Sequence, residues 1–252
     1  MLSALLAYAP QGNPAPVVPP ACAADRYDGT GQVGAVFDGD TLALGDGTKV
    51  RLGGIDTPET GRDGEPSEPF AEEAYGHLLD IAGPGRRLNL RFDLERRDRY
   101  GRVLAHVFLA DGSNVQASLL RRGLATTLVV PPNEWSHACY ARIEARARAA
   151  RRGIWSLARY QAVPAEALDA EARGFRIVTG VIRRIGESRH NLWLNLSPDF
   201  ALRIPRGDLD NFRDVDLHRL RGRRVEARGW IHERRQQLRM TIRHPAALHL
   251  TE

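Results

Sequence analysis

Apolar and polar residues alternate over several short segments in the first 110 residues, and this period of two is typical of half-buried β-strands. Other segments place apolar residues at every third or fourth position, which indicates amphipathic helices, and glycines at 83, 123 and 153 end them. The predicted strands are 33–37, 41–44, 49–52, 88–92 and 103–109, and the predicted helices are 69–82, 113–122 and 133–152.

This order has five strands, with helices after the third and the fifth strand and a further helix at the end. It fits a five-stranded Greek-key barrel of the OB type with packed helices. A second strand-rich unit repeats the order without repeating the sequence, and a short polar segment, 208–220, lies between its third and fourth strands. We therefore predict a mainly β chain with packed helices, of the α+β class, in which a second small OB-like barrel follows the first. The strands predicted for the second barrel are 175–185, 192–196, 200–204, 224–231 and 238–242.

The composition divides the chain into four regions: a leader with a Pro-rich linker (1–29), the first barrel domain (30–156), an Ala-rich helical linker (157–173) and an OB-like accessory domain (174–252). Within the first region, the apolar run at 2–9 ends in an Ala-x-Ala pattern but lacks a basic segment before it. A disordered tail and an export signal are both compatible with this pattern.

Two tryptophans, Trp193 and Trp230, fall within predicted strands of the second barrel. We expect them to be core residues. The alternative is an exposed groove in which aromatic rings bind nucleobases, as OB-folds use them.

Charge is distributed unevenly along the 252 residues, whose formal net charge is +5. Residues 1–164 contain 19 basic and 19 acidic residues, whereas 165–252 contain 17 basic and 12 acidic ones, and all basic residues except Lys49 are arginines. A basic surface favours a polyanionic partner, and arginine binds phosphate in two-pronged geometry. The second barrel is therefore expected to add affinity for nucleic acid without adding catalysis, through arginines at strand ends and turns: Arg183, Arg184, Arg189, Arg221, Arg223, Arg224, Arg234 and Arg235.

The chain has two cysteines, Cys22 and Cys139. In an exported protein they could pair, and in a cytosolic one they would be unrelated thiols. We predict the disulfide, which would fix the segment before the first strand to the terminal helix. The alternative is two separate thiols, one of them lost if a leader is cleaved after Ala23.

Three motifs carry the candidate chemistry: Asp38-Gly-Asp40-Thr41, the run from Arg51 to Asp56-Thr57-Pro58-Glu59, and Asp98-Arg99-Tyr100-Gly-Arg102. Asp-Gly-Asp by itself is a common turn sequence. Together, however, the motifs combine carboxylates, which hold a hard cation or activate a water, with arginines, which stabilise charge on a phosphate. This combination indicates phosphodiester hydrolysis.

The order and spacing of these motifs resemble those of the staphylococcal nuclease (thermonuclease) family, over residues 30–156 approximately. The resemblance implies an OB-type barrel and a calcium-dependent endonuclease acting on DNA or RNA and leaving 3′-phosphate ends. It implies that Asp40, Asp56 and the Thr57 carbonyl bind Ca²⁺. It further implies that Glu59 prepares the attacking water and that Arg51 and Arg102 act on the phosphate. Tyr100 and Arg99, in the same turn as Arg102, are expected to contact the substrate.

One segment departs from the family pattern. Where family members often place tyrosines that stack on the bound nucleotide, residues 126–132 read Thr-Thr-Leu-Val-Val-Pro-Pro and contain no aromatic ring. Base stacking by this segment is therefore not expected.

Two rival functions remain open at this stage: a non-catalytic nucleic-acid-binding protein with two OB-like barrels, and a protein-interaction scaffold. The complete carboxylate and arginine set favours the enzyme. We further expect a periplasmic or secreted monomer that does not insert into membranes, since the chain has no run of 18 apolar residues.

Overall fold

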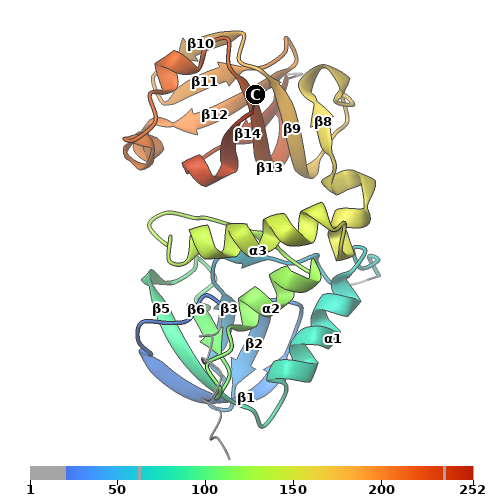
Figure 1. Cartoon of the computed structure of the whole chain (residues 1–252), viewed down its shortest axis with the longest axis vertical. Coiled ribbons are helices and arrows are strands. Elements are labelled where there is room, and N and C mark those ends of the chain that lie inside the picture. The colour runs from blue at the N-terminus through green and yellow to red at the C-terminus, as the bar shows by residue number, and fades with distance from the viewer. Residues whose placement is uncertain (1–20, 62–63, 235–236, 252) are drawn as a thin grey trace, which may run out of the picture.

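The computed structural model describes residues 21–61, 64–234 and 237–251. The apolar run at 2–9 and Arg235 therefore lie outside the described residues. Two β-structures are stacked along the long axis of the molecule, and helix α3 lies between them (Figure 1). Within the described residues, no helix has both the length and the apolar character needed to span a bilayer.

The first β-structure is a closed five-stranded barrel with the order β1-β2-β3-β6-β5, in which β3 and β6 run parallel and the other pairs are antiparallel. Leu42, Val50, Leu52, Leu88 and Val107 fill its buried core. The barrel and its three helices confirm the fold class predicted for this part of the chain. Their bounds are β1 Gly29–Val36, β2 Thr41–Leu44, β3 Lys49–Leu52, β5 Arg87–Arg97, β6 Val103–Phe108, α1 Ala71–Ala82, α2 Val115–Arg122 and α3 His137–Ala149.

A two-stranded sheet outside the barrel pairs β4 (Ile55–Asp56) with β7 (Thr126–Thr127). Asp56 lies opposite Thr126 in this pairing. The loop after β3 is therefore held by the segment that leads into α3, and this pairing fixes the backbone at one of the predicted metal ligands.

Two glycines bring the ends of α2 and α3 together. Gly123 and Gly153 both have positive φ, and a Cβ on Gly123 would lie 2.2 Å from the Arg152 carbonyl oxygen. The Ile154 amide donates to the Gly123 carbonyl at 2.9 Å. Only glycine allows this close approach. The helix end predicted at Gly123 is confirmed. The helix predicted over 133–152 is shorter, because α3 spans His137–Ala149 and Gly153 begins a 3-10 turn.

The second β-structure repeats the strand order of the first. Its principal strands are arranged β11-β12-β14-β13-β9, and β12 and β14 run parallel. Short strands β8 and β15 pair with β9 and β13. The bounds are β8 Ala162–Pro164, β9 Gly174–Val181, β10 Arg184–Glu187, β11 Asn191–Asn195, β12 Phe200–Pro205, β13 Arg224–Arg234, β14 Gln237–Thr241 and β15 Leu248–Thr251.

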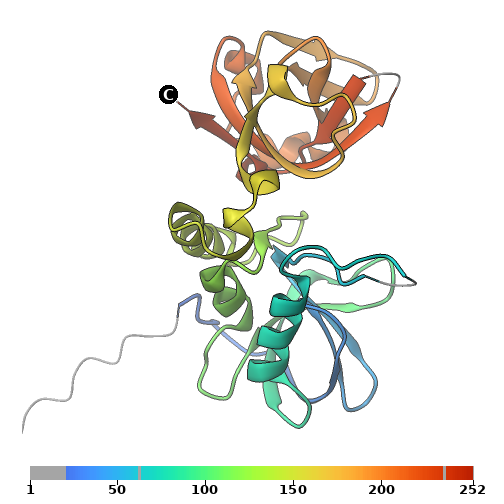
Figure 2. The same ribbon diagram turned by 90° about the vertical axis from the view of Figure 1, so that its right-hand side faces the viewer.

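The bend between β9 and β10 closes this second barrel. β9 pairs with β13, whereas β10 pairs with β11. At the bend, the Ile182 amide donates to Arg223 and the Arg183 amide donates to Asn195. β9 and β10 together therefore act as one bent strand that pairs with β13 at one end and with β11 at the other. The strands form a ring (Figure 2). Two 3-10 helices, Arg206–Phe212 and Leu217–Leu220, occupy the predicted polar insert.

The predicted helical linker at 157–173 is wrong as a continuous helix. The segment contains 3-10 turns at Ala158–Tyr160 and Ala165–Ala167, and between them β8 pairs in parallel with β9. Pro164 lacks the N–H that a helix interior needs, and tertiary contacts override the helix propensity of the alanines. Residues from both barrels form a buried joint here: Ala147, Ile154, Trp155, Tyr160, Phe175 and Ile177.

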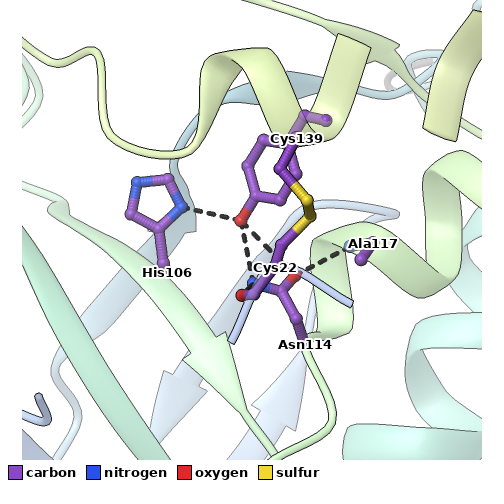
Figure 3. Close-up of a disulfide and its surroundings, with 6 residues drawn as sticks. Cys22, His106, Asn114, Ala117 and Cys139 are labelled. Atoms are coloured by element: carbon purple, nitrogen blue, oxygen red, sulfur yellow. Dashed lines mark hydrogen bonds between the residues drawn. A yellow bond between two sulfur atoms is a disulfide. The ribbon is translucent and has the colours of Figure 1, made fainter. Parts of the chain in front are cut away.

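The predicted disulfide between Cys22 and Cys139 is present, with the Cα atoms 5.8 Å apart. Beside it, Asn114 caps α2 by accepting from the Ala117 amide, and its side-chain amide donates to the Cys22 carbonyl (Figure 3). The disulfide and the cap together fix the segment before β1 to α2 and α3.

We expect reduction of this disulfide to destabilise the first barrel substantially. The cysteines are 117 positions apart, and cross-linking a loop of this length lowers the entropy of the unfolded chain by the equivalent of about 4–5 kcal/mol. Urea unfolding with and without dithiothreitol measures the effect. The double variant Cys22→Ser/Cys139→Ser is the control and should not respond to the reductant. An unchanged unfolding midpoint of the reduced wild-type protein would contradict the prediction.

Candidate active site

The Asp-Gly-Asp turn between β1 and β2 forms the base of the site. The Asp38 carboxylate accepts from the Asp40 amide at 3.0 Å, which fixes the turn. A Cβ on Gly39 would lie 2.6 Å from the Ala74 Cβ and 2.8 Å from the Thr57 hydroxyl, so only glycine fits against α1 here. This close packing leaves Asp40 buried, with 5% of its surface exposed.

Arg51 joins the two predicted metal ligands. Its guanidinium group lies 2.8 Å from an oxygen of Asp40 and 2.8 Å from an oxygen of Asp56. It also donates to the carbonyls of Leu52 and Ile55, both at 3.1 Å. The alternation in β3 turns Arg51 away from the buried side chains of Val50 and Leu52, as the sequence pattern predicted.

Thr57 lies beneath the cleft rather than on its surface. Its backbone amide and its hydroxyl both donate to Asp40 at 3.0 Å, and only 6% of its surface is exposed. The residue therefore orients one predicted ligand, Asp40, by direct hydrogen bonds.

The negative charge of the cluster exceeds its positive charge. Burial, reinforced by the neighbouring Asp38 and Asp56, raises the pKa of Asp40 to about 7 although Arg51 opposes the shift. Burial also raises the pKa of Asp56, and burial together with the charges of Asp56 and Asp38 raises the pKa of Glu59. Four carboxylates thus surround one guanidinium group.

This imbalance fits a bound cation. Hard cations such as Ca²⁺ take oxygen ligands from carboxylates, backbone carbonyls and water, and such oxygens line the site. Among the residues that the structure describes, no three or more His, Cys, Asp or Glu side chains are arranged as a metal-ligand cluster. A cation here would therefore need carbonyl or water oxygens besides the aspartates.

Arg102 reaches the same site from the turn between β5 and β6. Asp98 accepts from the Arg102 amide at 2.9 Å and from its Nε at 2.7 Å, which orients the side chain. The Arg102 Nη1 then donates to the Thr41 hydroxyl at 3.3 Å, and that hydroxyl donates to Asp40 at 3.1 Å. The guanidinium group thereby lies one hydroxyl away from a predicted ligand.

The same turn presents an exposed aromatic ring. Tyr100 is 69% exposed, and the guanidinium carbons of Arg99 and Arg102 lie 4.8 and 5.6 Å from its ring centroid. The ring and the two cations stand at the edge of the cleft, where a phosphate or sugar can reach them.

Glu59 is exposed, on a loop whose two ends are tied together. Its amide donates to the Glu68 carboxylate at 3.1 Å, and the Glu68 amide donates to the Glu59 carbonyl at 2.9 Å. Arg159, from the joint between the barrels, pairs with Glu68 at 3.0 Å. The loop that carries Glu59 is therefore connected to the second half of the chain.

One cleft contains seven of the eight predicted site residues. Thr57, the eighth, is the buried residue that bonds to Asp40. The seven that line the cleft are Asp40, Arg51, Asp56, Glu59, Arg99, Tyr100 and Arg102.

Among the other residues that line this cleft, three bear on its chemistry although the sequence patterns gave them no role. Asp38 and Glu68 line it, and Asp38 was visible within its own motif. Trp230, from β13 of the second barrel, lines it as well and is 50% exposed. The prediction that Trp230 is a core residue is therefore wrong, and Trp193 is only partly buried and lies outside the second core as well. The signal was the parity of the strand, because Val225, Ala227 and Ile231 are buried on the opposite face.

The first barrel has relatives among known proteins. A family described as Staphylococcal nuclease homologue matches residues 49–157, a range that begins after Asp40. A thermonuclease of Staphylococcus intermedius is 34% identical over 127 residues, which cover 48% of this chain and 72% of that protein.

Two longer relatives are also similar. A probable endonuclease, LCL3, of Schizophyllum commune is 37% identical over 130 residues, covering 46% of this chain and 43% of that protein. Endonuclease YhcR of Bacillus subtilis is 29% identical over 186 residues, 69% of this chain and 15% of that protein. The chain thus spans less than half the length of these two relatives.

We expect Asp40→Asn to stabilise the metal-free protein in a pH-dependent way. The pKa of Asp40 is raised in the folded state to about 7, so the contribution of this residue to the stability of the folded state falls as the pH rises from about 4 to 7. The amide carries no charge to bury. The gain should be near zero at pH 4 and about 1–4 kcal/mol at pH 8.

Urea unfolding in EDTA at both pH values measures this gain. Asp46→Asn is the matched control, because Asp46 is exposed on a hairpin turn and its pKa is lowered by a hydrogen bond to the Thr48 amide. Equal stability of Asp40→Asn and the wild-type protein at pH 8 would show that the cluster is not electrostatically strained.

Proposed function

Because the chain belongs to the staphylococcal nuclease homologue family, we propose that it is a calcium-dependent endonuclease that hydrolyses phosphodiester bonds of DNA, RNA or both. The observation that supports this most strongly is the convergence of Asp40, Arg51, Asp56, Glu59 and Arg102 in one cleft from four separate segments. Because Asp40 and Arg102 are 62 positions apart in the sequence, unrelated turn residues and surface charges would not be expected to meet in one cleft.

In this proposal Asp40, Asp56 and the Thr57 carbonyl hold Ca²⁺, which when bound supplies positive charge next to the scissile phosphate. Asp40 is already oriented by two hydrogen bonds from Thr57. Burial, with the charges of Asp38 and Asp56, raises the pKa of Asp40, so a nearby cation would favour its charged form. Arg51 supplies part of that charge and, by joining both aspartates, keeps them close together.

Glu59 acts as the general base. It is exposed at the cleft, and its pKa is raised by burial of part of the carboxyl and by Asp56 and Asp38, which makes it a better proton acceptor near neutral pH. It takes a proton from a water whose oxygen attacks phosphorus. The bond between phosphorus and the 5′ oxygen breaks, and the leaving oxygen takes a proton from solvent water. The products are a 3′-phosphate and a 5′-hydroxyl.

Arg102 and Arg51 stabilise the charge that develops on the phosphoryl oxygens. Asp98 orients Arg102 through two hydrogen bonds, so little reorganisation is needed when the phosphate arrives. Arg99 and Tyr100 contact the neighbouring phosphate or sugar from the edge of the cleft.

The disulfide between Cys22 and Cys139 supports a periplasmic or secreted location, since disulfides persist in oxidising compartments. Of the arginines expected to give the second barrel a basic surface, those that the structure describes are exposed. We propose that they add affinity for phosphate backbones without sequence preference.

Degradation of plasmid DNA and of a long RNA, followed on gels with Ca²⁺ and with excess chelator, tests the proposed activity. Fragmentation in Ca²⁺ alone is expected. Binding of either nucleic acid without cleavage would instead support the two-barrel binding protein, and the absence of both would support a protein-interaction scaffold.

We expect Glu59→Gln and Arg102→Ala each to lower the turnover number about 10²–10³-fold without unfolding the protein. Each removes one group that acts only on the reacting water or on the developing charge. Steady-state cleavage rates and circular dichroism give the readouts. Glu73→Gln and Arg121→Ala, at exposed positions on α1 and α2, are matched controls that should keep wild-type rates. Full activity of either site variant would remove that residue from the mechanism.

We expect Asp56→Ala to weaken Ca²⁺ binding at least tenfold, because a hard-cation site loses one of its charged ligands. Titration calorimetry of the metal into the folded variant measures this affinity directly. Asp80→Ala serves as the control, because Asp80 is an exposed acidic residue on α1. An unchanged dissociation constant for Asp56→Ala would place the metal elsewhere.

A further inference from the structure

The outer face of β13 turns three alternating side chains toward the first domain. Glu226 accepts two hydrogen bonds from Arg148, at 2.6 and 2.9 Å. Arg228, two residues on, donates to Glu144 at 2.5 and 2.8 Å, and both side chains of this pair are almost fully buried. Trp230 follows at the same spacing. Because residues i, i+2 and i+4 of a strand share a face, docking of the first two fixes where Trp230 lies.

Trp230 projects beyond the docked interface into the catalytic cleft. It lines the cleft together with Asp40, Glu59 and Tyr100, and half of its surface is exposed. Its partner in the pairing of β13 with β9 is Phe175, which is buried in the joint between the barrels. The indole therefore shares the cleft with the catalytic groups, and half of its surface remains exposed to solvent.

A second groove continues from the cleft past the same ring. Asp56, Leu128, Val130 and Trp230 all line it, and the two aliphatic side chains are 36% and 48% exposed. This aliphatic segment is the one that lacks an aromatic ring in the sequence. The second barrel thus supplies, on β13, the flat apolar surface that the first barrel does not provide on this side of the cleft.

Two arginines lie close to Trp230. A Cβ on Gly174 would be 3.8 Å from a guanidinium nitrogen of Arg159, 3.8 Å from one of Arg176 and 4.0 Å from the Trp230 ring. Arg159 is paired with Glu68, whereas Arg176 donates to the backbone carbonyl of Phe175. Both guanidinium groups therefore lie within about 8 Å of the ring, and an aromatic ring with an arginine at this distance suits a base and its backbone phosphate.

We propose that Trp230 stacks on a nucleobase next to the scissile phosphate, and that Arg176 contacts the backbone phosphate of that nucleotide. The second barrel then contributes directly to the substrate site of the first. This inference rests on the nuclease activity proposed above. Because a base must leave its duplex to stack on an indole, a single-stranded oligonucleotide is the probe.

The test compares full-length Trp230→Ala and Trp230→Phe in the cleavage of a ten-residue oligothymidylate. Loss of one stacked base should raise KM about 5- to 150-fold with little change in kcat, and phenylalanine should restore most of the loss. Trp193→Ala is the matched control: Trp193 lies on β11 of the same barrel, its ring is covered by Arg239 at 4.8 Å, and it does not line the cleft.

Oligonucleotides with a single abasic position separate stacking from a structural role. For the wild-type enzyme, one abasic position should raise KM as much as Trp230→Ala does, and for Trp230→Ala the same position should have no further effect. Arg176→Ala should weaken the binding of the intact and the abasic oligomer equally, and it should reduce the dependence of binding on salt concentration. An unchanged KM for Trp230→Ala would overturn the inference. So would an equal increase in KM for Trp230→Ala on the intact and on the abasic oligomer.

Binding of the same oligomers, labelled with fluorescein and measured by anisotropy in EDTA, keeps this test independent of catalysis. If the wild-type protein cleaves nothing but binds the intact oligomer more tightly than Trp230→Ala does, the proposed activity fails and the stacking site stands. If cleavage is normal and Trp230→Ala binds like the wild-type protein, the stacking site fails alone.

Discussion

The buried carboxylate of Glu144 on α3 determines how the two barrels fit together. It accepts four hydrogen bonds: from the amide and the hydroxyl of Thr127, and from two nitrogens of Arg228. A buried ion pair adds little net stability, but removing one partner leaves an uncompensated charge that costs about 3–5 kcal/mol. The pair therefore selects one docked arrangement over others. Because Thr127 belongs to β7, which pairs with β4, the same carboxylate connects the backbone at Asp56 to the second barrel.

The site itself is held by groups whose preferences conflict. Four carboxylates crowd around Arg51, and burial keeps the pKa of Asp40 near 7 although a guanidinium group lies 2.8 Å away. Such an arrangement persists only where the surrounding structure enforces it. Here the enforcement comes from the turn at Gly39, which is packed against α1, and from the two hydrogen bonds of Thr57. The fold thus maintains a surplus of negative charge that a cation can neutralise.

Local patterns in the sequence predicted both barrels and most of the site, for a physical reason. Alternation reports which side of a strand is buried, and the motifs around Asp40, Asp56 and Arg102 are short enough for tight turns to hold them. Contacts between distant segments, in contrast, are not marked by any local sequence pattern. The pairing of Glu144 with Arg228 joins residues 84 positions apart, and nothing in either segment marks the partner. The linker was predicted as a helix because its alanines favour one, but pairing of β8 with β9 is a tertiary effect.

The exposure of Trp230 follows from the alternation of side chains along β13. A large aromatic residue in a strand is usually buried, which favoured the core, yet the alternation of β13 had already assigned the inner face to Val225, Ala227 and Ile231. The outer face of an OB-type strand normally meets water. In this chain it meets α3 through Glu226 and Arg228, and the next outward residue must then lie beyond the edge of that helix. The two barrels share one strand order but contribute differently to the cleft. The first barrel positions the charged groups, and the second presents an aromatic ring on the same cleft.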